Sequence, residues 1–347
     1  MTNKPSQPGV NQGSSIERNG TVVVDGATGY VGSHITAALR NLGYKVRCLV
    51  RPQSTEEDVE LLKSTGAQVF RGMLGAPDSQ STLNEAFSGA ASAIHTIGSV
   101  APKRGETLTD LHIHQTASFV DCCKRNGVDK VIMISSLGTR ENANAEYYKT
   151  KWLAEKVLRD SGLPSVIFRP ALILGQTFGR RNSKLVARYL KLISEKTTVP
   201  LIARGANIIQ PIFIQDVVKA VTEALARPVS DTTVYGQCLN IAGPEQLTMR
   251  QFVERLALEV AGEKRDFKNI PPGIASIGAA FCELFQDVPM VSKDQIKLAL
   301  ENNGCSDNAL EPVLQIKPTR LADAFASYKP ETEERIVSKK GARQEVS

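Results

Sequence analysis

The chain has 347 residues, of which 41% are hydrophobic and 22% are charged, an ordinary globular composition with enough length for a large core. The net charge of +6 is modest and the basic residues are scattered, which argues against a nucleic-acid partner and leaves small anionic ligands open. No window approaches the roughly 18 apolar residues that a membrane-spanning helix needs, so we expect no membrane span.

Both ends of the chain lack the pattern of a folded segment. Residues 1–19 are polar and rich in Ser, Asn, Gln, Gly and Pro, and residues 329–347 are densely charged, so we expect a disordered leader and a disordered tail. The six cysteines form no CxxC pair, which is typical of reduced thiols. These features predict a cytoplasmic protein, or an organellar-matrix protein if the source is eukaryotic.

From residue 20 onward, short β-branched runs alternate with helix-like segments. The runs are TVVVD, YKVRCLV, AQVF, SAIHTI, KVIMIS and SVIFRP. This alternation predicts an α/β fold with a doubly wound parallel sheet, a Rossmann core, over residues 20–174. Residues 175–328 predict a smaller, mostly helical lobe over the carboxyl ends of the strands, with some strands returning to the core.

The sequence VVVDGATGYVGSHITAAL places a buried strand directly before three glycines and a helix. Gly26 permits the tight turn, Gly29 allows the backbone to approach a pyrophosphate, and Gly32 lets the helix pack against the strand. A merely structural turn is the alternative. The strand–turn–helix context at the start of the fold favours a dinucleotide site.

The end of the second predicted strand indicates which dinucleotide binds. An NAD site usually has Asp or Glu about 20 residues after the glycines, where the carboxylate binds the ribose hydroxyls. Here Arg51 occupies that place, and no carboxylate follows before Glu56. A guanidinium suits a 2′-phosphate, so NADP is favoured over NAD. NAD is the alternative cofactor, and a solvated arginine is the alternative interpretation of Arg51.

The segment NAEYYKTKWLAEKVL predicts a helix that carries Tyr147 and Lys151 on one face, one turn apart. Any two polar residues on an exposed helix face share this spacing. Beside a dinucleotide, however, Tyr147 would exchange a proton with a substrate carbonyl, and Lys151 would bind the nicotinamide ribose and favour the phenolate. A hydroxyl from Ser135 or Ser136 would orient the substrate oxygen, and we take Ser136 as the third catalytic residue.

Other motifs exclude reaction classes or give weaker signals. The four histidines form no metal-binding pattern, and neither a GxSxG motif nor a carboxylate pair indicates a hydrolase. Arg180 and Arg181 would reach an acidic substrate, although the favoured interpretation is that both lie in a solvated loop.

The segment GIASIGAAFCELF, residues 273–285, is expected to line or cover the substrate cleft. A buried packing helix is an equal alternative, and a membrane-surface helix is less favoured.

Six motifs occur in a characteristic order: DGATGYVG, VRCLVRP, ISS, YYKTKWLAE, SGLPSVIFRPALILG and QPIFIQDVVKAV. In this order they resemble the extended and atypical short-chain dehydrogenases/reductases, a superfamily that includes the NAD-dependent epimerases/dehydratases. The second half most resembles the nucleotide-binding accessory subunit of respiratory complex I, alpha-subcomplex subunit nine, and its bacterial relatives. The resemblance covers nearly the whole folded body and implies the fold and the cofactor more strongly than the reaction.

The resemblance also implies roles for individual residues. It implies that Arg51 binds the adenosine phosphate, that Lys151 binds the ribose and that Tyr147 donates the proton. It assigns the pyrophosphate loop to Gly26, Thr28, Gly29, Tyr30, Val31 and Gly32. Leu74 is expected at the cofactor as well.

Two positions depart from the family pattern. The family commonly has Gly-Asp-Leu after the third strand, where this chain has Gly72-Met73-Leu74. Leu137 occupies the usual place of the catalytic hydroxyl, and we expect Ser136 to substitute for it.

Two hypotheses for the function follow. The first is an NADP-dependent oxidoreductase that reduces a carbonyl or oxidises a hydroxyl on an unidentified small molecule, using Tyr147 and Lys151. The second is a protein that binds the nucleotide without turnover, as a subunit or assembly factor of a respiratory-type complex with a protein partner. We favour the first hypothesis, and binding without turnover would separate the two.

Overall fold

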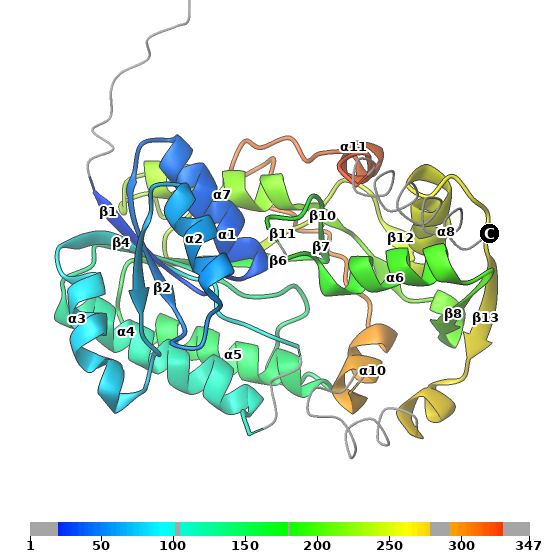
Figure 1. Ribbon diagram of the computed structural model, residues 1–347, viewed down its shortest axis with the longest axis horizontal. Coiled ribbons are helices and arrows are strands. Elements are labelled where there is room, and N and C mark those ends of the chain that lie inside the picture. The colour runs from blue at the N-terminus through cyan, green and yellow to red at the C-terminus, as the bar shows by residue number, and fades with distance from the viewer. Residues whose placement is uncertain (1–19, 101–104, 180, 278–291, 329–347) are drawn as a thin grey trace, which may run out of the picture.

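A seven-stranded parallel sheet forms the centre of the protein, in the order β11-β6-β5-β4-β1-β2-β3 (Figure 1). The computed structural model describes residues 20–100, 105–179, 181–277 and 292–328. The strands are β1 (Thr21–Asp25), β2 (Lys45–Val50), β3 (Gln68–Arg71), β4 (Ala90–His95), β5 (Lys130–Ile134), β6 (Ser165–Pro170) and β11 (Cys238–Ile241). The strand order reverses between β1 and β4, where doubly wound sheets bind their ligands. The predicted fold class is therefore confirmed.

Apolar residues on alternate sides of the strands explain why helices cover both faces of the sheet. In β1, Val22 and Val24 belong to one buried cluster and Val23 belongs to the other. The first face packs against α1 (Tyr30–Asn41), α2 (Glu56–Ser64) and α7 (Ile214–Ala226). The second face packs against α3 (Gln80–Phe87), α4 (Gln115–Arg125) and α5 (Glu146–Arg159).

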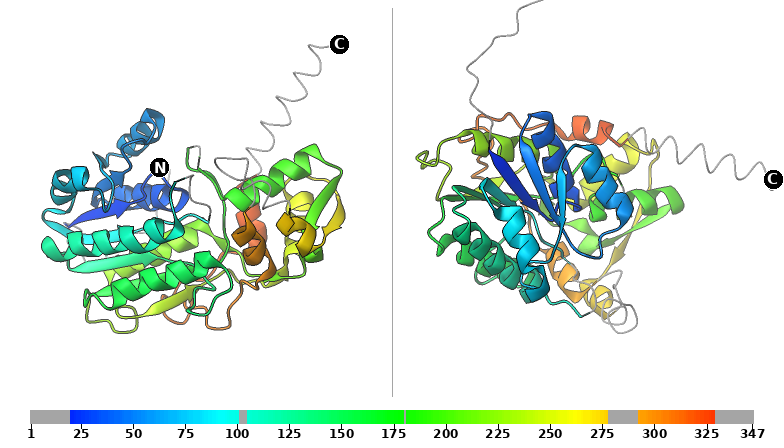
Figure 2. Two further views of the ribbon diagram at one scale, coloured as in Figure 1. Left: turned by 90° about the horizontal axis from the view of Figure 1, so that it is seen from below. Right: turned by 60° about the vertical axis from the view of Figure 1, so that its left-hand side comes forward.

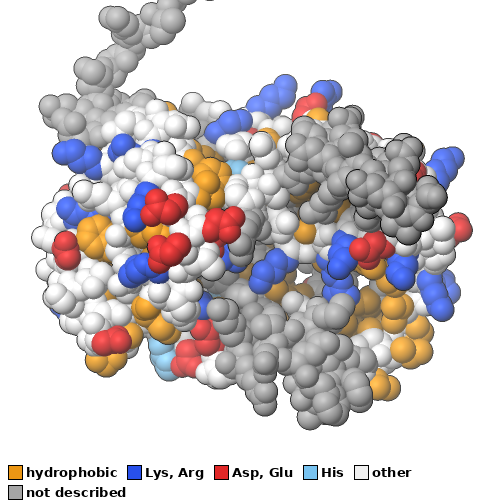
Figure 3. All heavy atoms as spheres, in the orientation of Figure 1, with side chains coloured by type: hydrophobic (Ala, Val, Ile, Leu, Met, Phe, Trp, Pro, Cys, Tyr) orange, Lys and Arg blue, Asp and Glu red, His pale blue; other side chains and the backbone are white. Residues whose placement is uncertain are grey.

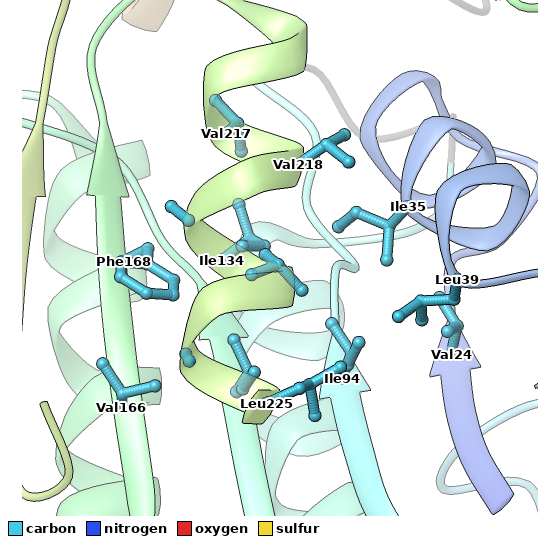
Figure 4. Close-up of a cluster of buried hydrophobic side chains, with 14 of the residues drawn as sticks. Val24, Ile35, Leu39, Ile94, Ile134, Val166, Phe168, Val217, Val218 and Leu225 are labelled. Carbon is cyan, nitrogen blue, oxygen red and sulfur yellow. The ribbon is translucent and has the colours of Figure 1, made fainter. Parts of the chain in front are cut away.

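Helix α7 belongs to the sheet and not to the smaller lobe, although it lies within residues 175–328. Figure 4 shows Val217 and Val218 of α7 beside Ile35 of α1, over the strand residues Ile134 and Phe168. β11, which follows α7, pairs in parallel with β6. Neighbouring parallel strands require a crossover connection, and a helix on the sheet face provides it. The chain therefore leaves the sheet after β6 and returns to it through α7 and β11.

The second lobe lies beside the sheet and has its own apolar cluster (Figure 2). Its helices are α6 (Lys184–Glu195), α8 (Met249–Glu259), α10 (Lys293–Leu300) and α11 (Leu321–Ala326), and β8 (Thr198–Ile202) pairs with β13 (Asp266–Ile270). Two further short pairs join β7 (Ile173–Leu174) to β10 (Ile212–Phe213) and β9 (Ile208–Ile209) to β12 (Leu247–Thr248). Three short helical turns are η1 (Pro77–Ser79) and η2 (Asp110–His114) in the sheet domain and η3 (Ala203–Gly205) in the second lobe.

Several sequence expectations concern parts of the chain outside the described residues. The leader, the tail and most of the segment 273–285 lie there, and so does Arg180. Within the described ranges, no helix has the length and apolarity needed to cross a membrane. Figure 3 shows basic and acidic side chains interspersed on the face turned to the viewer.

Candidate dinucleotide site

The glycine loop between β1 and α1 is shaped so that larger residues do not fit. Gly26 has a φ of +58°, which favours glycine. A Cβ on Gly32 would lie 2.5 Å from the carbonyl oxygen of Gly26, and a Cβ on Gly29 would lie 2.9 Å from the same oxygen. Gly29 is also the N-cap of α1, and no side chain caps that terminus within the described residues. The N-terminus of α1 therefore points at the glycine loop, where the helix dipole favours an anion.

Asp25 fixes the loop at the point where the strand order reverses. Its buried carboxylate accepts hydrogen bonds from the backbone N–H of Thr96, at 2.6 Å, and of Ile97, at 3.2 Å, and it also bonds to Nδ1 of His95. These contacts join the ends of β1 and β4. The sequence analysis did not single out Asp25, although a carboxylate that ends the apolar run VVVD was a visible signal.

The adenosine end of the predicted site carries an unexpected acid. Arg51 follows β2 and donates from Nη1 to Oε1 of Glu106 at 3.0 Å. Glu106 lies 55 residues away in the sequence, so the residues that directly follow Arg51 give no sign of it. Arg71, at the end of β3, donates to the carbonyl oxygens of Pro52 and Ser54, both at 2.9 Å. Arg71 therefore holds the loop that follows Arg51.

Leu74 lies next to this end of the site, but its side chain points into the core. It is 2% exposed and belongs to the cluster that contains Leu49, Leu83 and Phe87. The side chain therefore supports the segment after β3, and a role of Leu74 in nucleotide binding stays a prediction.

Ser136, Tyr147 and Lys151 come together at the carboxyl ends of β4 and β5. Lys151 is 2% exposed, and its Nζ donates to the carbonyl oxygens of Ile97, at 3.1 Å, and Ile134, at 3.2 Å. Burial lowers the pKa of Lys151 to about 8, against the opposing effect of Glu155 and Asp25. Their catalytic roles stay predictions, but the three residues occupy one site.

Tyr147 differs from the sequence expectation in its protonation. Burial raises the pKa of Tyr147, and a hydrogen bond with Ser136 opposes this only in part. We expected Lys151 to favour the phenolate, whereas removal of the phenol from water dominates in this structure. Tyr147 therefore keeps its proton at neutral pH.

The structure distinguishes between the two neighbouring serines. The Ser135 hydroxyl donates to Oε1 of Glu155 at 2.5 Å, and this buried carboxylate also pairs with Arg169. The Leu137 side chain is 5% exposed and lies in the core cluster of the first sheet face. Ser136 is therefore the serine whose hydroxyl reaches Tyr147.

The second lobe contacts the site at both ends. Tyr30, in the first turn of α1, donates to the carbonyl oxygen of Gly175 at 3.0 Å, and Arg181 donates to Asp58 of α2 at 2.8 Å. The Arg181 side chain is 49% exposed, so it makes this contact between the lobes from a solvent-facing loop, as the favoured interpretation of the sequence expects. At the other end, Asp294 of α10 accepts from the backbone N–H groups of Glu146 and Tyr147, at 2.7 and 2.9 Å. A carboxylate of the second lobe thus caps the helix that carries Tyr147.

His95 and His112 are buried at the candidate site, although the sequence analysis considered the histidines only as possible metal ligands and found no such pattern. The described part of the chain holds no group of three or more His, Cys, Asp or Glu side chains placed to bind a metal ion. His95 instead bonds to Asp25 and to Thr116, and His112 packs edge-on against the Tyr147 ring with a centroid distance of 5.4 Å. His112 is thus a site residue that the sequence analysis missed.

Comparison with known proteins places these features in a family. The NmrA-like family matches residues 18–329. NADH dehydrogenase (ubiquinone) 1 alpha subcomplex subunit 9, mitochondrial, from Dictyostelium discoideum is 26% identical over 296 residues, which are 83% of this chain and 78% of that protein. The ceramide reductase of Caulobacter vibrioides is 26% identical over 195 residues, which are 54% of this chain and 58% of that protein.

A solved structure shows the same fold. UDP-glucuronic acid 4-epimerase from Bacillus cereus, in complex with UDP-glucuronic acid and NAD, matches with a TM-score of 0.67 and 20% identity, over 90% of this chain and 99% of that chain. Together with the sequence relatives, this match confirms the predicted resemblance to the extended short-chain dehydrogenases/reductases. The fold is thus of the NAD(P)-binding, epimerase- and reductase-like type.

Proposed function

We propose, since this chain belongs to the NmrA-like family, that it is an NADP(H)-dependent oxidoreductase that reduces a carbonyl group on a small molecule, in the cytoplasm or in an organellar matrix. The observation that carries the proposal is the grouping of Ser136, Tyr147 and the buried Lys151 beside the glycine loop. A serine, a tyrosine and a lysine in one water-poor site suit acid catalysis at a carbonyl oxygen.

The residues present fit a dinucleotide. The loop from Gly26 to Gly32 and the N-terminus of α1 would hold the pyrophosphate, because both present backbone N–H groups without side chains in the way. Arg51 would bind the 2′-phosphate and Lys151 the nicotinamide ribose. When bound, the nicotinamide supplies or accepts the hydride.

The protonation states favour reduction over oxidation near neutral pH. Burial raises the pKa of Tyr147, so its phenol is a proton donor to the carbonyl oxygen and not a base. The Ser136 hydroxyl would hold that oxygen in place. Burial lowers the pKa of Lys151 to about 8, which still leaves most of its ammonium charged at neutral pH.

The proposal is tested by following NADPH oxidation with a panel of aldehydes, quinones, steroids and nucleotide sugars. We expect turnover with at least one class and a rate lower by on the order of 10² to 10⁴ in Tyr147→Phe. Tight binding of NADPH by the unmodified protein without oxidation on any of these substrates would contradict the proposal.

A second candidate function is supported by one of the relatives. The chain is 26% identical, over 83% of its length, to a protein named as a subunit of NADH dehydrogenase. Under this alternative the bound nucleotide stabilises a protein that attaches to a larger respiratory-type complex. Affinity purification from the native source distinguishes the two, because a subunit copurifies in a fixed ratio with partner proteins and an independent reductase does not.

A further inference from the structure

A small cleft opens in the second lobe, where β8 and β13 lie at the opposite end of the molecule from β1 and α1 (Figure 1). Its volume is about 130 Å³, equal to about four water molecules at their share of liquid volume. Drug-sized ligands need pockets of about 300 Å³ or more, so the cleft suits a group much smaller than a dinucleotide. It is lined by Leu201, Arg204, Arg250, Phe267, Lys268 and Asn269.

The lining of this cleft brings together three cations from different elements. Arg204 lies in the turn η3, Arg250 lies in the first turn of α8, and Lys268 lies in the middle of β13. Among the described residues that line the cleft, none carries a carboxylate. Arg250 donates from Nε to Oε1 of Glu254 at 2.8 Å, so one acidic charge stands beside three basic ones. The cleft therefore keeps a positive charge of about two.

Two of these cations have no partner within the part of the chain that the structure describes. The side chains of Arg204 and Lys268 are exposed and make neither a hydrogen bond nor an ion pair there. Arginines elsewhere pair with carboxylates, as Arg71 does with Glu56. Like charges that line one cleft repel each other, so an anion bound between them would be stabilised by both.

The third cation, Arg250, is held in place by two contacts. Its guanidinium lies over the Phe267 ring, 5.1 Å from the ring centroid, and its Nε bonds to Glu254. Its terminal nitrogens Nη1 and Nη2 have no hydrogen bond among the described residues. A fixed guanidinium with two such nitrogens suits a contact with two oxygens of one anion. The first turn of a helix adds the positive end of its dipole.

The turn that carries Arg204 has an unusual backbone. Ala203, Arg204 and Gly205 have φ values of +47°, +61° and +65°, and the left-handed region is unfavourable for the two residues that are not glycine. Such strain persists only where the surrounding structure enforces it, and it is concentrated at functional sites. A Cβ on Gly205 would lie 2.8 Å from the backbone nitrogen of Arg250. This close packing of the turn on α8 brings Arg204 and Arg250 to one cleft.

Asn269 adds a neutral donor to the cleft. Its Oδ1 accepts from the backbone N–H of Arg204 at 2.8 Å, which fixes the orientation of the amide and leaves Nδ2 as a donor. Nδ2 has no hydrogen bond among the described residues. The side chains of Arg204, Arg250, Lys268 and Asn269 therefore offer hydrogen-bond donors and no vacant acceptor. A ligand with several acceptor oxygens and a double negative charge matches this set, and a phosphate ester has both properties.

We propose that this cleft binds the phosphoryl group of a phosphate ester, at a site separate from the candidate dinucleotide site. Arg204 and Arg250 bind its oxygens, and Lys268 neutralises the remaining charge. The inference does not rest on the proposed function, because none of the residues that line the cleft belongs to the dinucleotide site.

The test is a titration of the whole protein with inorganic phosphate at constant ionic strength, followed through backbone amide signals in NMR spectra. We expect the signals of Gly205 and Asn269 to shift and to reach saturation. The amides of Gly26 and Gly29 report separately on the dinucleotide site, so one titration distinguishes the two sites. Sodium chloride at the same ionic strength is the control, and equal shifts with chloride would overturn the inference.

Vesicles distinguish two sources of the phosphoryl group. The protein is sedimented with vesicles of phosphatidylcholine and phosphatidic acid, and the experiment is repeated with Arg204→Gln. Vesicle binding that is lost in Arg204→Gln identifies a lipid headgroup as the source. With any other result, a phosphate shift at Gly205 identifies a soluble phosphate ester.

Variants of single cations decide whether the cleft is the site. Arg204→Gln and Lys268→Gln should each weaken phosphate binding at Gly205 about tenfold, the effect of one hydrogen bond to a charged group. Lys191→Gln is the matched control, because it removes the same charge from an exposed position of α6 outside the cleft. It should change the affinity by less than about twofold. Equal losses in Lys191→Gln and Lys268→Gln would overturn the inference, and so would the absence of a saturable shift at Gly205 in the unmodified protein.

Discussion

The two ends of the candidate cofactor site are built on different physical principles. At the adenosine end, Arg51 is 30% exposed and is already paired with a carboxylate of the same protein, Glu106. At the nicotinamide end, Lys151 and His112 are 2% and 1% exposed. Charges at the first end are screened by water, and such pairs contribute little. Polar groups at the second end are shielded from water, so each hydrogen bond gained or lost there has a larger effect.

Because of this difference, we expect the two ends to have different roles in binding and reaction. Under the proposed function, the exposed end would select between dinucleotides through a charge balance that one substitution can change. The buried end fixes the atoms that would carry out the reaction. Substitutions at the buried end and in the loop between the ends should therefore have larger effects than those at the exposed end.

The largest effect is expected in the glycine loop that joins the two ends. Gly29→Val should abolish dinucleotide binding, because a Cβ there already approaches the Gly26 carbonyl to 2.9 Å and the branched side chain would fill the pyrophosphate space. Gly273→Ala is the control, because no atom of the described residues, its chain neighbours aside, lies within 4 Å of a Cβ at that position. Unchanged affinity in a folded Gly29→Val protein, as judged by circular dichroism, would show that the nucleotide binds elsewhere.

The next largest effect is expected at Tyr147, with its neighbour as the matched control. Tyr147→Phe should lower the reduction rate by on the order of 10² to 10⁴ and leave cofactor affinity nearly unchanged. Tyr148 is buried, and its hydroxyl accepts from Nδ2 of Asn303 at 3.3 Å, so Tyr148→Phe should retain most of the rate. If steady-state kinetics showed a larger loss of rate in Tyr148→Phe than in Tyr147→Phe, Tyr147 would not be the proton donor.

The pH dependence of binding should report the burial of Lys151. Its pKa is lowered from 10.5 to about 8, so its ammonium is lost as the pH rises through about 8. Affinity for NADPH should fall above that pH, whereas affinity for 2′,5′-ADP, which carries only the adenosine half, should not. A flat NADPH profile from neutral to alkaline pH would argue that Lys151 does not contact the ligand.

The same shift predicts how stability changes with pH. Between a pH of about 8 and 10.5, the unfolded state holds the Lys151 proton that the folded state has released. Lys151 therefore contributes a stability that increases with pH across this window. Urea denaturation at both ends of the window should show a change with pH that is more positive in the unmodified protein than in Lys151→Met, because other buried groups such as the Tyr147 phenol contribute to both proteins.

A smaller effect is expected at the cap that joins the lobes. Asp294→Ala removes the acceptor for two backbone N–H groups of α5 and should lower the free energy of unfolding by about 1 kcal/mol. Asp294→Asn keeps one acceptor oxygen, so it should lower the free energy of unfolding by less than Asp294→Ala does. Thermal denaturation provides the measurement, and equal stability of Asp294→Ala and the unmodified protein would show that the cap contributes nothing.

The smallest effect is expected at the exposed end. Glu106→Gln frees Arg51 from its ion pair and should strengthen NADPH binding by roughly 0.2–1 kcal/mol, the range for exposed pairs. Arg51→Ala should weaken NADPH binding and leave NADH binding unaffected. Calorimetry with both dinucleotides tests this. If Glu106→Gln increased the affinity for NADH as much as the affinity for NADPH, a contact between Arg51 and the 2′-phosphate could not explain the increase.

Features that depend on short stretches of sequence could be predicted. The strand–glycine–helix unit around Gly26 follows from local backbone geometry, and the shared face of Tyr147 and Lys151 follows from helical periodicity. The alternation of strand-like and helix-like segments was sufficient to predict the parallel sheet. These features need no knowledge of which distant segments meet.

Features that depend on distant contacts could not be predicted. Asp294 caps a helix that begins 148 residues earlier in the chain, and Asp25 meets His95 across 70 residues. A single sequence shows these residues only as isolated polar positions. For a related reason the buried side chain of Leu74 was not expected, because the sequence alone does not tell whether a residue after a strand faces the core or the ligand.

Asp294 of the second lobe caps the N-terminus of α5, which packs against the sheet, so the position of this helix end depends on both lobes. Anything that binds the surface of α10 and draws Asp294 away from α5 would alter the setting of Tyr147. Thermodynamic reciprocity then requires that whatever stabilises that setting from within the site also changes the affinity at α10. The outer lobe could thus sense whether the nucleotide is present without any movement of the sheet.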